Sequence, residues 1–318
     1  MDRKVLVTGA GGFIGHHLVT KLVNMGHEVR AIDIKYPEFQ TSKASEFILS
    51  DLRSYENCIA ATKGISQVYN LAADMGGIGY ITSKFAEIAR NNVLINSHML
   101  EASRVNEIDT FFYSSSACIY PTEKQKNTAN ISLRESDAYP ADPEEGYGWE
   151  KLFSEKLCEY YSKDYGLRTR VARLHNVYGP LGTYTGGKEK APAALCRKIA
   201  MASNGDKIEI WGDGRQTRSF MFIDDCIEGI TRIVNSDVSE PLNLGTDHLI
   251  SINEMVDLIC LISGKTLSKV TDLSKPQGVR GRNSDNSKIK NLLGWAPNYP
   301  LEKGLSKTYS WIYSQINI

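Results

Sequence analysis

The stretch Thr8-Gly9-Ala10-Gly11-Gly12-Phe13-Ile14-Gly15 decides the fold of this chain. It follows a short apolar segment, residues 4–8, that predicts a buried strand, and it opens residues 13–25, whose apolar positions recur at helical spacing. Residues 28–33 predict a second strand, which ends in Asp33. A glycine-rich turn between a strand and a helix, with an acidic residue at the end of the next strand, is typical of a dinucleotide-binding βαβ unit.

Three glycines of this turn each have a physical task. Gly9 allows the tight turn, Gly12 lets the backbone approach a pyrophosphate at the helix N-terminus, and Gly15 lets the helix pack against the strand. The carboxylate of Asp33 can accept hydrogen bonds from the hydroxyls of the adenosine ribose, and its charge would repel a 2′-phosphate. We therefore expect NAD rather than NADP as the cofactor.

Predicted strands and helices alternate through the first half of the chain. Further strands are expected at residues 47–51, 67–71, 110–114 and 169–174, and long helices at residues 85–105 and 149–164. This alternation predicts an α/β fold with a Rossmann-type doubly wound parallel sheet. We expect an NAD-binding domain over residues 1–180, and over residues 181–318 a smaller C-terminal lobe, mainly for substrate, that could interleave with the first domain.

Composition excludes several classes of partner. The 318 residues carry 37 basic and 37 acidic side chains, so the chain offers no broad field to nucleic acid or to anionic lipid. No stretch approaches the roughly 20 apolar residues that span a bilayer, and the first residues do not resemble a signal peptide. The six cysteines lie 30 to 60 residues apart, which gives no metal-binding pair. We expect a cytoplasmic protein with no metal site.

A tyrosine and a lysine four residues apart can form an acid/base pair, because a helix places both on one face. The lysine charge would lower the pKa of the phenol from about 10. This spacing occurs five times in the chain. Prolines follow Tyr120 and Tyr299, and glycines surround the pairs that begin at Tyr80 and Tyr184. Only Tyr147 and Lys151 enter a long predicted helix, so we assign catalysis to that pair.

Ser116 and Cys118 follow the strand predicted at residues 110–114, at the sheet edge where ligands bind. The hydroxyl of Ser116 can hydrogen-bond the substrate oxygen that Tyr147 deprotonates. A free thiol has a pKa of about 8.5, so Cys118 could transfer protons near neutral pH if a cation lies nearby.

The glycine spacing, Asp51-Leu52 and Asn70-Leu71-Ala72-Ala73 together resemble the extended short-chain dehydrogenase/reductase superfamily. The resemblance implies that Asp51 meets the adenine amino group and that the turn after Asn70 lies along the cofactor. The expected cofactor-binding residues are then Gly9, Gly12, Phe13, Ile14, Gly15, Asp33, Asp51, Leu52, Leu71, Ala72, Ala73, Tyr147 and Lys151.

Two sugar-nucleotide families have a similar Ser-x-Cys-Ile-Tyr-Pro segment. GDP-fucose synthases pair the thiol with a later histidine, and GDP-mannose 3,5-epimerases pair it with a lysine. Residues 186–194 of this chain contain Lys190 and no histidine, and so resemble the epimerases. Residues 72–77, 139–143, 175–180, 211–214, 216–220 and 278–286 also resemble that family, whereas Thr122 and residues 183–185 depart from it.

The resemblance implies a catalytic cycle. Tyr147 removes the C4 hydroxyl proton while NAD takes the C4 hydride, and the resulting ketone acidifies C3 and C5. Cys118 and Lys190 then exchange protons on opposite faces of the ring before the hydride returns. Candidate substrate contacts include the diphosphate-binding Lys198, Arg218 and Arg280, and also Gly76, Ser116, Cys118, Asn176, Glu189, Lys190, Ala191, Gln216 and Thr217.

Two other functions remain open at this point. The chain could be another nucleotide-sugar epimerase or a dehydratase, for example one that acts on a GDP-heptose or a 4-keto GDP-sugar. It could also be an NAD-binding regulator without turnover. The superfamily resemblance further implies a homodimer that pairs the helices at residues 85–105 and 149–164.

Overall fold

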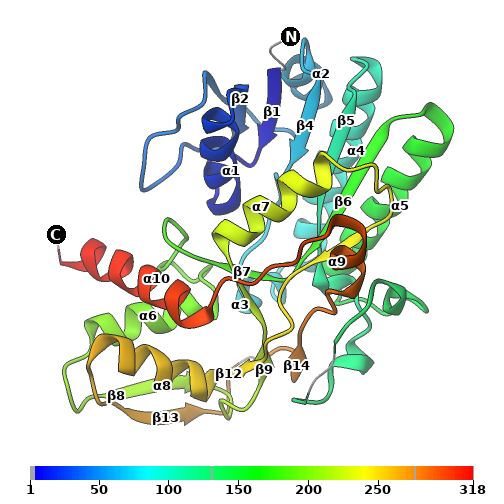
Figure 1. Cartoon of the computed structure of the whole chain (residues 1–318). Helices are drawn as coiled ribbons and strands as arrows, with labels where there is room; N and C mark the ends of the chain where they lie inside the picture. The colour runs from blue at the N-terminus through cyan, green and yellow to red at the C-terminus, as the bar shows by residue number, and fades with distance from the viewer. Residues whose placement is uncertain (1–3, 130–131, 276, 318) are drawn as a thin grey trace.

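A parallel sheet of seven strands organises the molecule (Figure 1). The computed structural model describes residues 4–129, 132–275 and 277–317. The strand order is β11-β6-β5-β4-β1-β2-β3, and every neighbouring pair is parallel. The strands are β1 Lys4–Thr8, β2 Glu28–Asp33, β3 Glu46–Leu49, β4 Gln67–Asn70, β5 Thr110–Ser116, β6 Arg168–Leu174 and β11 Leu242–Leu244. The expected Rossmann-type sheet is confirmed.

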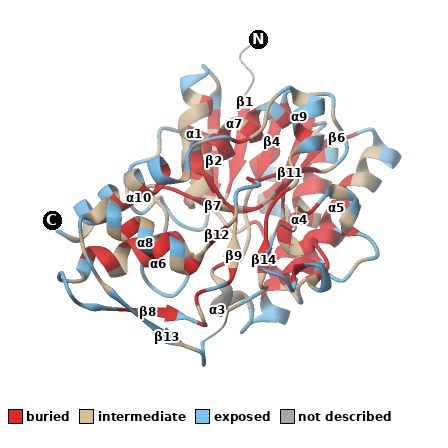
Figure 2. Cartoon of the chain, turned by 60° about the horizontal axis from the view of Figure 1, so that its bottom comes forward, coloured by how far each residue is buried: buried red, intermediate tan, exposed pale blue. Residues whose placement is uncertain are grey.

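Helices cover both faces of this sheet, so its central strands are buried. Val5, Leu6 and Val7 of β1 have no exposed surface, and Figure 2 shows the central strands as buried. One face carries α1 (Phe13–Asn24) and α7 (Ile223–Val234), which pack against each other. The other face carries α2 (Tyr55–Thr62), α4 (Phe85–Val105) and α5 (Tyr147–Tyr165).

A smaller lobe is built from later parts of the chain. Its helices α6 (Ala191–Met201), α8 (Ile252–Ser263) and α10 (Leu301–Ile316) pack together, beside the parallel pair of β8 (Lys207–Trp211) and β13 (Ser268–Asp272). The short strands β7 (Asn176–Tyr178), β9 (Thr217–Arg218), β10 (Phe220–Phe222), β12 (Ile250–Ser251) and β14 (Gly281–Arg282) form two further sheets. Between these segments, α7 and β11 return to the central sheet, so the chain after residue 180 contributes to both parts.

The structure shifts two predicted boundaries that matter for the site. The strand predicted at residues 110–114 continues to Ser116, and the helix predicted at residues 149–164 begins at Tyr147. Gly146 precedes this helix with a φ of +66°, a conformation that favours glycine. Tyr147 therefore stands at the first position of α5, directly beyond the end of β5.

A buried ion pair joins α5 to the sheet. Nη2 of Arg173, on β6, lies 2.8 Å from Oε2 of Glu155, on α5, and both side chains are only 5% exposed. The hydroxyl of Ser115, on β5, donates a second hydrogen bond to Glu155 at 2.5 Å. These contacts hold α5 in register with the two strands whose ends carry the candidate catalytic residues.

We expect Arg173→Met to lower the free energy of unfolding by about 3–5 kcal/mol, because Glu155 would remain as a buried charge without its partner. Urea unfolding followed by circular dichroism measures the change. Arg168→Met, on the same strand but at an exposed position, is the control and should cost less than about 1 kcal/mol. Equal effects of the two substitutions would contradict a structural role for the ion pair.

Candidate active site

The glycine turn after β1 lies so close to neighbouring backbone atoms that Gly9 and Gly15 have no room for a side chain. A Cβ on Gly9, whose φ is +67°, would lie 2.8 Å from the carbonyl oxygen of Leu71, and a Cβ on Gly15 would lie 2.2 Å from the carbonyl oxygen of Gly9. Gly12 caps α1, and its lack of a side chain keeps the first N–H groups of the helix open to an anion. These features fit the pyrophosphate of a dinucleotide.

Asp33 lies at the same edge of the sheet. Its carboxylate accepts hydrogen bonds from the backbone N–H groups of Gly11 at 2.9 Å and Lys35 at 3.2 Å. Burial raises the pKa of Asp33, and the backbone hydrogen bonds oppose that shift. The turn after β4 is held nearby, because the Thr8 hydroxyl accepts hydrogen bonds from the N–H groups of Leu71 and Ala72, each at 3.0 Å.

The start of α5 packs directly on the turn after β5. A Cβ on Gly148 would lie 2.4 Å from the carbonyl oxygen of Cys118, and that oxygen accepts a hydrogen bond from the N–H of Glu144 at 3.0 Å. The hydroxyl of Ser116 accepts a hydrogen bond from the N–H of Cys118 at 3.2 Å. This contact brings together Ser116, Cys118 and Tyr147, which the sequence carries on two separate elements.

Tyr147 and Lys151 are buried one helical turn apart. The Nζ atom of Lys151 lies 5.5 Å from the ring centre of Tyr147 and donates a hydrogen bond to the carbonyl oxygen of Ser114 at 3.0 Å. Burial raises the pKa of Tyr147 well above 10 and lowers the pKa of Lys151. The expected lowering of the Tyr147 pKa by Lys151 is therefore outweighed by burial in the protein alone.

A cleft of about 370 Å³ opens at the carboxyl edge of the sheet, between the two lobes. Ser116, Cys118 and Tyr147 line one side, and residues of α6, β8, β9 and β14 line the other. Five basic side chains face this cleft against three acidic ones, so it favours an anionic ligand. The basic residues are Lys190, Arg197, Lys198, Arg218 and Arg282.

Residues 5–245 match the family described as the NAD dependent epimerase/dehydratase family. The chain belongs to this family. It is 52% identical to the GDP-mannose 3,5-epimerase of Arabidopsis thaliana, over 98% of this chain and 83% of that protein. It is 51% identical to GDP-mannose 3,5-epimerase 1 of Oryza sativa subsp. japonica, over 98% of this chain and 82% of that protein. It also resembles a crystal structure of UDP-glucuronic acid 4-epimerase from Bacillus cereus with UDP-glucuronic acid and NAD, at 29% identity and a TM-score of 0.83, over 98% of this chain and 99% of that one.

NAD is the cofactor of this epimerase/dehydratase family, and the glycine turn and Asp33 of the chain fit it. Phe13 and Ile14 form the first turn of α1. The predicted adenine contact Asp51 is paired in the structure with Arg53, at 2.5 Å between Oδ2 and Nη2, and Leu52 beside it is buried. Ala73 continues the turn after β4.

Most of the predicted substrate residues line the cleft. These are Gly76, Ser116, Cys118, Asn176, Glu189, Lys190, Ala191, Lys198, Gln216 and Arg218. The Oε1 atom of Gln216 is buried without a hydrogen-bond partner, so it can accept a hydrogen bond from a ligand. Thr217 and Arg280 do not line the cleft: the Thr217 hydroxyl donates to the carbonyl of Thr128, and Arg280 pairs with Asp213 at 3.0 Å.

The cleft residues that the sequence interpretation did not assign include Glu144, His175 and Arg282. Arg282 lies two residues after Arg280, within the matched segment 278–286, and nothing in the sequence distinguishes the two guanidinium groups. His175 is 3% exposed, and both its ring nitrogens are buried without a hydrogen-bond partner. Burial lowers the pKa of His175 to about 3, so the ring is neutral.

The two candidate proton-exchange groups approach the cleft from different elements. Cys118 lies in the turn after β5, and Lys190 caps the N-terminus of α6. Burial raises the pKa of Cys118 and lowers the pKa of Lys190, and the charge of Cys118 opposes the shift of Lys190. Both shifts favour neutral groups, a thiol and an amine, at neutral pH.

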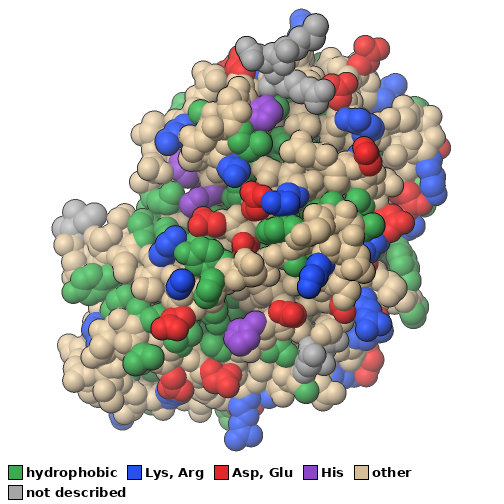
Figure 3. Space-filling view, in the orientation of Figure 1, with side chains coloured by type: hydrophobic (Ala, Val, Ile, Leu, Met, Phe, Trp, Pro, Cys, Tyr) green, Lys and Arg blue, Asp and Glu red, His purple; other side chains and the backbone are tan. Residues whose placement is uncertain are grey.

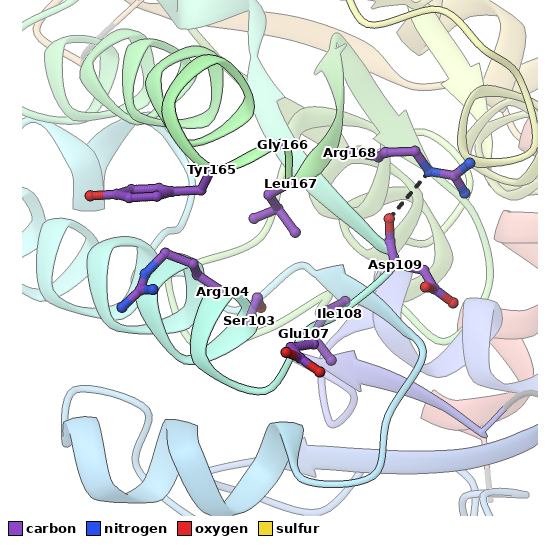
Figure 4. Close-up of a pocket in the computed structure, with 9 residues that line it drawn as sticks. All are labelled: Ser103, Arg104, Glu107, Ile108, Asp109, Tyr165, Gly166, Leu167 and Arg168. Atoms are coloured by element: carbon purple, nitrogen blue, oxygen red, sulfur yellow. Dashed lines mark hydrogen bonds between the residues drawn. The ribbon is translucent and has the colours of Figure 1, made fainter.

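A second hollow lies at the opposite edge of the sheet, where α4 and α5 end and β5 and β6 begin (Figure 4). Its polar groups serve the fold. Arg168 donates to the carbonyl of Asp109 at 3.2 Å, and Arg104 pairs with Glu101 at 2.6 Å and lies over the ring of Tyr165. Ligands of doubly wound sheets bind at the carboxyl edge, so we assign the active site to the first cleft.

The face of the molecule drawn in Figure 3 carries no large patch of a single charge. Acidic and basic side chains are interspersed over the face in Figure 3. Within the described ranges, no helix is long and apolar enough to cross a membrane, and no group of His, Cys, Asp and Glu side chains could hold a metal ion.

We expect Asp33→Ser to weaken the preference for NAD over NADP by at least about tenfold, because it removes the charge that repels the 2′-phosphate. Fluorescence titration of the purified protein with NADH and NADPH measures the ratio of the two dissociation constants. Glu38→Gln, at a less buried acid nearby, is the control. Tighter binding of NADP than of NAD by the unmodified protein would overturn the role of Asp33.

Proposed function

We propose that this protein is a GDP-mannose 3,5-epimerase, which converts GDP-mannose to GDP-L-galactose and GDP-L-gulose. The main support for this proposal is that Cys118 and Lys190, on separate elements, line the same cleft as Tyr147 and Ser116. A simple 4-epimerase needs the tyrosine alone, whereas exchange of carbon-bound protons needs two further acid/base groups. The names of the two plant relatives support the same activity.

The first step is loss of the C4 hydroxyl proton to Tyr147. Bound NAD supplies the hydride acceptor at C4, and its oxidised ring brings a positive charge. Burial keeps Tyr147 neutral in the protein alone, and the positive charge of a bound oxidised nicotinamide would favour its phenolate. A hydrogen bond with Ser116 favours the phenolate in the same direction. Lys151, fixed by the carbonyl of Ser114, holds its ammonium group within the same buried space.

The second step is proton exchange beside the ketone. A carbonyl at C4 acidifies the hydrogens at C3 and C5, and inversion requires removal of a proton from one face and return from the other. A single base would restore the original configuration. Cys118 on the β5 side and Lys190 at the start of α6 are the two groups that we assign to these faces. Burial favours the neutral form of each group, and a neutral thiol can donate a proton while a neutral amine can accept one.

The substrate diphosphate is best matched by Arg218 and Lys198. Arg218 donates to the carbonyl oxygens of Gln277 and Val279, and burial together with Arg282 lowers its pKa, so an added anion would be favoured there. Lys198 Nζ is held by the carbonyl of Glu209 at 3.0 Å. Arg280 remains a proposed contact, although it must first leave Asp213.

We also infer a cytoplasmic homodimer. Trp149, Phe153 and Tyr160 are each about half exposed and follow each other at helical spacing on α5. Phe85, at the start of α4, is also exposed and lies beside the start of α5. A second copy of the chain could cover this aromatic stripe with its own α4 and α5.

The six cysteines are free, which suits a reducing compartment.

Light scattering after gel filtration should give about twice the 35.4 kDa of one chain. We expect the double variant Trp149→Glu/Phe153→Glu to elute as a monomer, because charges would have to be buried in the interface. The control Leu261→Glu replaces an apolar residue that is 74% exposed on α8 and should stay dimeric. A monomeric unmodified protein would contradict the proposal.

Turnover of GDP-mannose in deuterated water tests the proposed reaction. We expect the unmodified enzyme to incorporate deuterium at C3 and C5, as read by NMR. Cys118→Ala and Lys190→Ala should slow incorporation by 10²–10⁴-fold while hydride transfer at C4 persists, whereas Tyr147→Phe should stop both steps. Incorporation that survives in Cys118→Ala would return this thiol to a packing role. A panel of other nucleotide sugars would reveal a different substrate.

A further inference from the structure

An acid–base pair that the mechanism has not used lies against the Cys118 thiol. The guanidinium of Arg282, on β14, forms an ion pair with the carboxylate of Glu144, in the loop before α5. The Nη1 atom of Arg282 also lies 3.5 Å from Sγ of Cys118 and donates to it. The two charged side chains are 8% and 18% exposed. A full positive charge and its counter-ion therefore lie beside the proposed proton-exchange group.

We propose that Glu144 is a positioning residue for proton exchange: it cancels the charge of Arg282 at Cys118, so that Cys118 rests as a neutral thiol able to donate a proton. The role in exchange rests on the proposed function, whereas the control of the thiol does not. Arg282 alone, without a counter-ion, would favour the thiolate.

The position of Arg282 does not depend on Glu144. The Nε atom of Arg282 donates to Oε1 of Gln125 at 2.6 Å, and the Gln125 amide is itself fixed by the carbonyl oxygens of Tyr120 and Pro121. Loss of the Glu144 charge would therefore leave the guanidinium beside the thiol. Glu144 is tied to the same turn, because its N–H donates to the carbonyl of Cys118.

The other charged groups near Cys118 do not replace this pair. Tyr147 and Lys151 of α5 are both pushed by burial toward their neutral forms, as is Lys190 at the start of α6. The charges of Arg282 and Cys118 act in opposite directions on the pKa of Arg218, on β9. Burial raises the pKa of Cys118, and the charge of Glu144 raises it further, whereas Arg282 lowers it. The Arg282 charge lowers the pKa of Glu144 despite burial, so the carboxylate is ionised at neutral pH.

The test titrates Cys118 by its rate of alkylation with iodoacetamide between about pH 6 and pH 9.5, read on the Cys118 peptide by mass spectrometry. In Glu144→Gln the uncompensated Arg282 should move the midpoint to lower pH and raise the rate at pH 7 by at least about tenfold. Glu145→Gln removes an exposed charge from the neighbouring position and should behave as the unmodified protein. An unchanged or higher midpoint in Glu144→Gln would overturn the proposal.

Two further variants test the same charges: one should shift the alkylation midpoint in the opposite direction, and the other should leave it nearly unchanged. Arg282→Gln leaves the Glu144 charge beside the thiol and should raise the midpoint, which keeps the proposal testable if Glu144→Gln does not fold. The double variant Glu144→Gln/Arg282→Gln removes both charges and should return the midpoint toward that of the unmodified protein. Midpoints that move in one direction in all three variants would indicate loss of structure and would overturn the proposal.

Catalysis supplies the second readout. In Glu144→Gln the ratio of deuterium incorporation to hydride transfer should fall at least about tenfold, because an ionised Cys118 has no proton to return. Alkylation needs no sugar, so a shifted midpoint in a protein that does not exchange carbon-bound protons would refute only the proposed function. Exchange in the unmodified enzyme with an unshifted midpoint in Glu144→Gln would refute only the role of Glu144.

Discussion

The active site depends on the close contact between the start of α5 and the turn after β5. This contact exists only because Gly148 has no Cβ: a methyl group there would lie 2.4 Å from the Cys118 carbonyl oxygen. The same carbonyl accepts the N–H of Glu144, so the loop before the helix is tied to the turn as well. A phenol, a hydroxyl and a thiol thereby meet at one end of the sheet, where a parallel arrangement places its ligands.

The second lobe completes the site because the chain crosses between the two parts more than once. After α6 and β8 have been built, α7 and β11 return to the central sheet, and the chain then leaves it again toward α8 and β14. Lys190 and Arg218 come from the segment before this return and Arg282 from the segment after it, and all three line the same cleft as Cys118. These crossings limit how far the lobes can separate, and they keep the positive charges opposite the catalytic edge.

Burial is the largest cause of the pKa shifts of the candidate catalytic residues. It raises the pKa values of Tyr147 and Cys118 and lowers those of Lys151 and Lys190, so all four groups tend toward neutral forms in the protein alone. Neutral acids and bases can exchange protons without the solvation cost of isolated buried charges. In the mechanism that we propose, the charge needed at each step would come from a cofactor, a substrate or the Glu144–Arg282 ion pair.

The sequence by itself determined the Rossmann-type sheet, the cofactor turn and the choice of Tyr147 among five tyrosine–lysine pairs, because these depend on local periodicity, glycine positions and helix breakers. Only the tertiary structure decided which of Arg280 and Arg282 enters the cleft, since both belong to one short segment and differ in their distant partners, Asp213 and Glu144. Likewise, the sign of the Tyr147 pKa shift followed from burial, which spacing along a helix does not reveal. Local order depends on residues near one another in the chain, whereas burial and the choice of ion-pair partner depend on distant residues: Arg280 and Asp213 are 67 positions apart, and Arg282 and Glu144 are 138 positions apart.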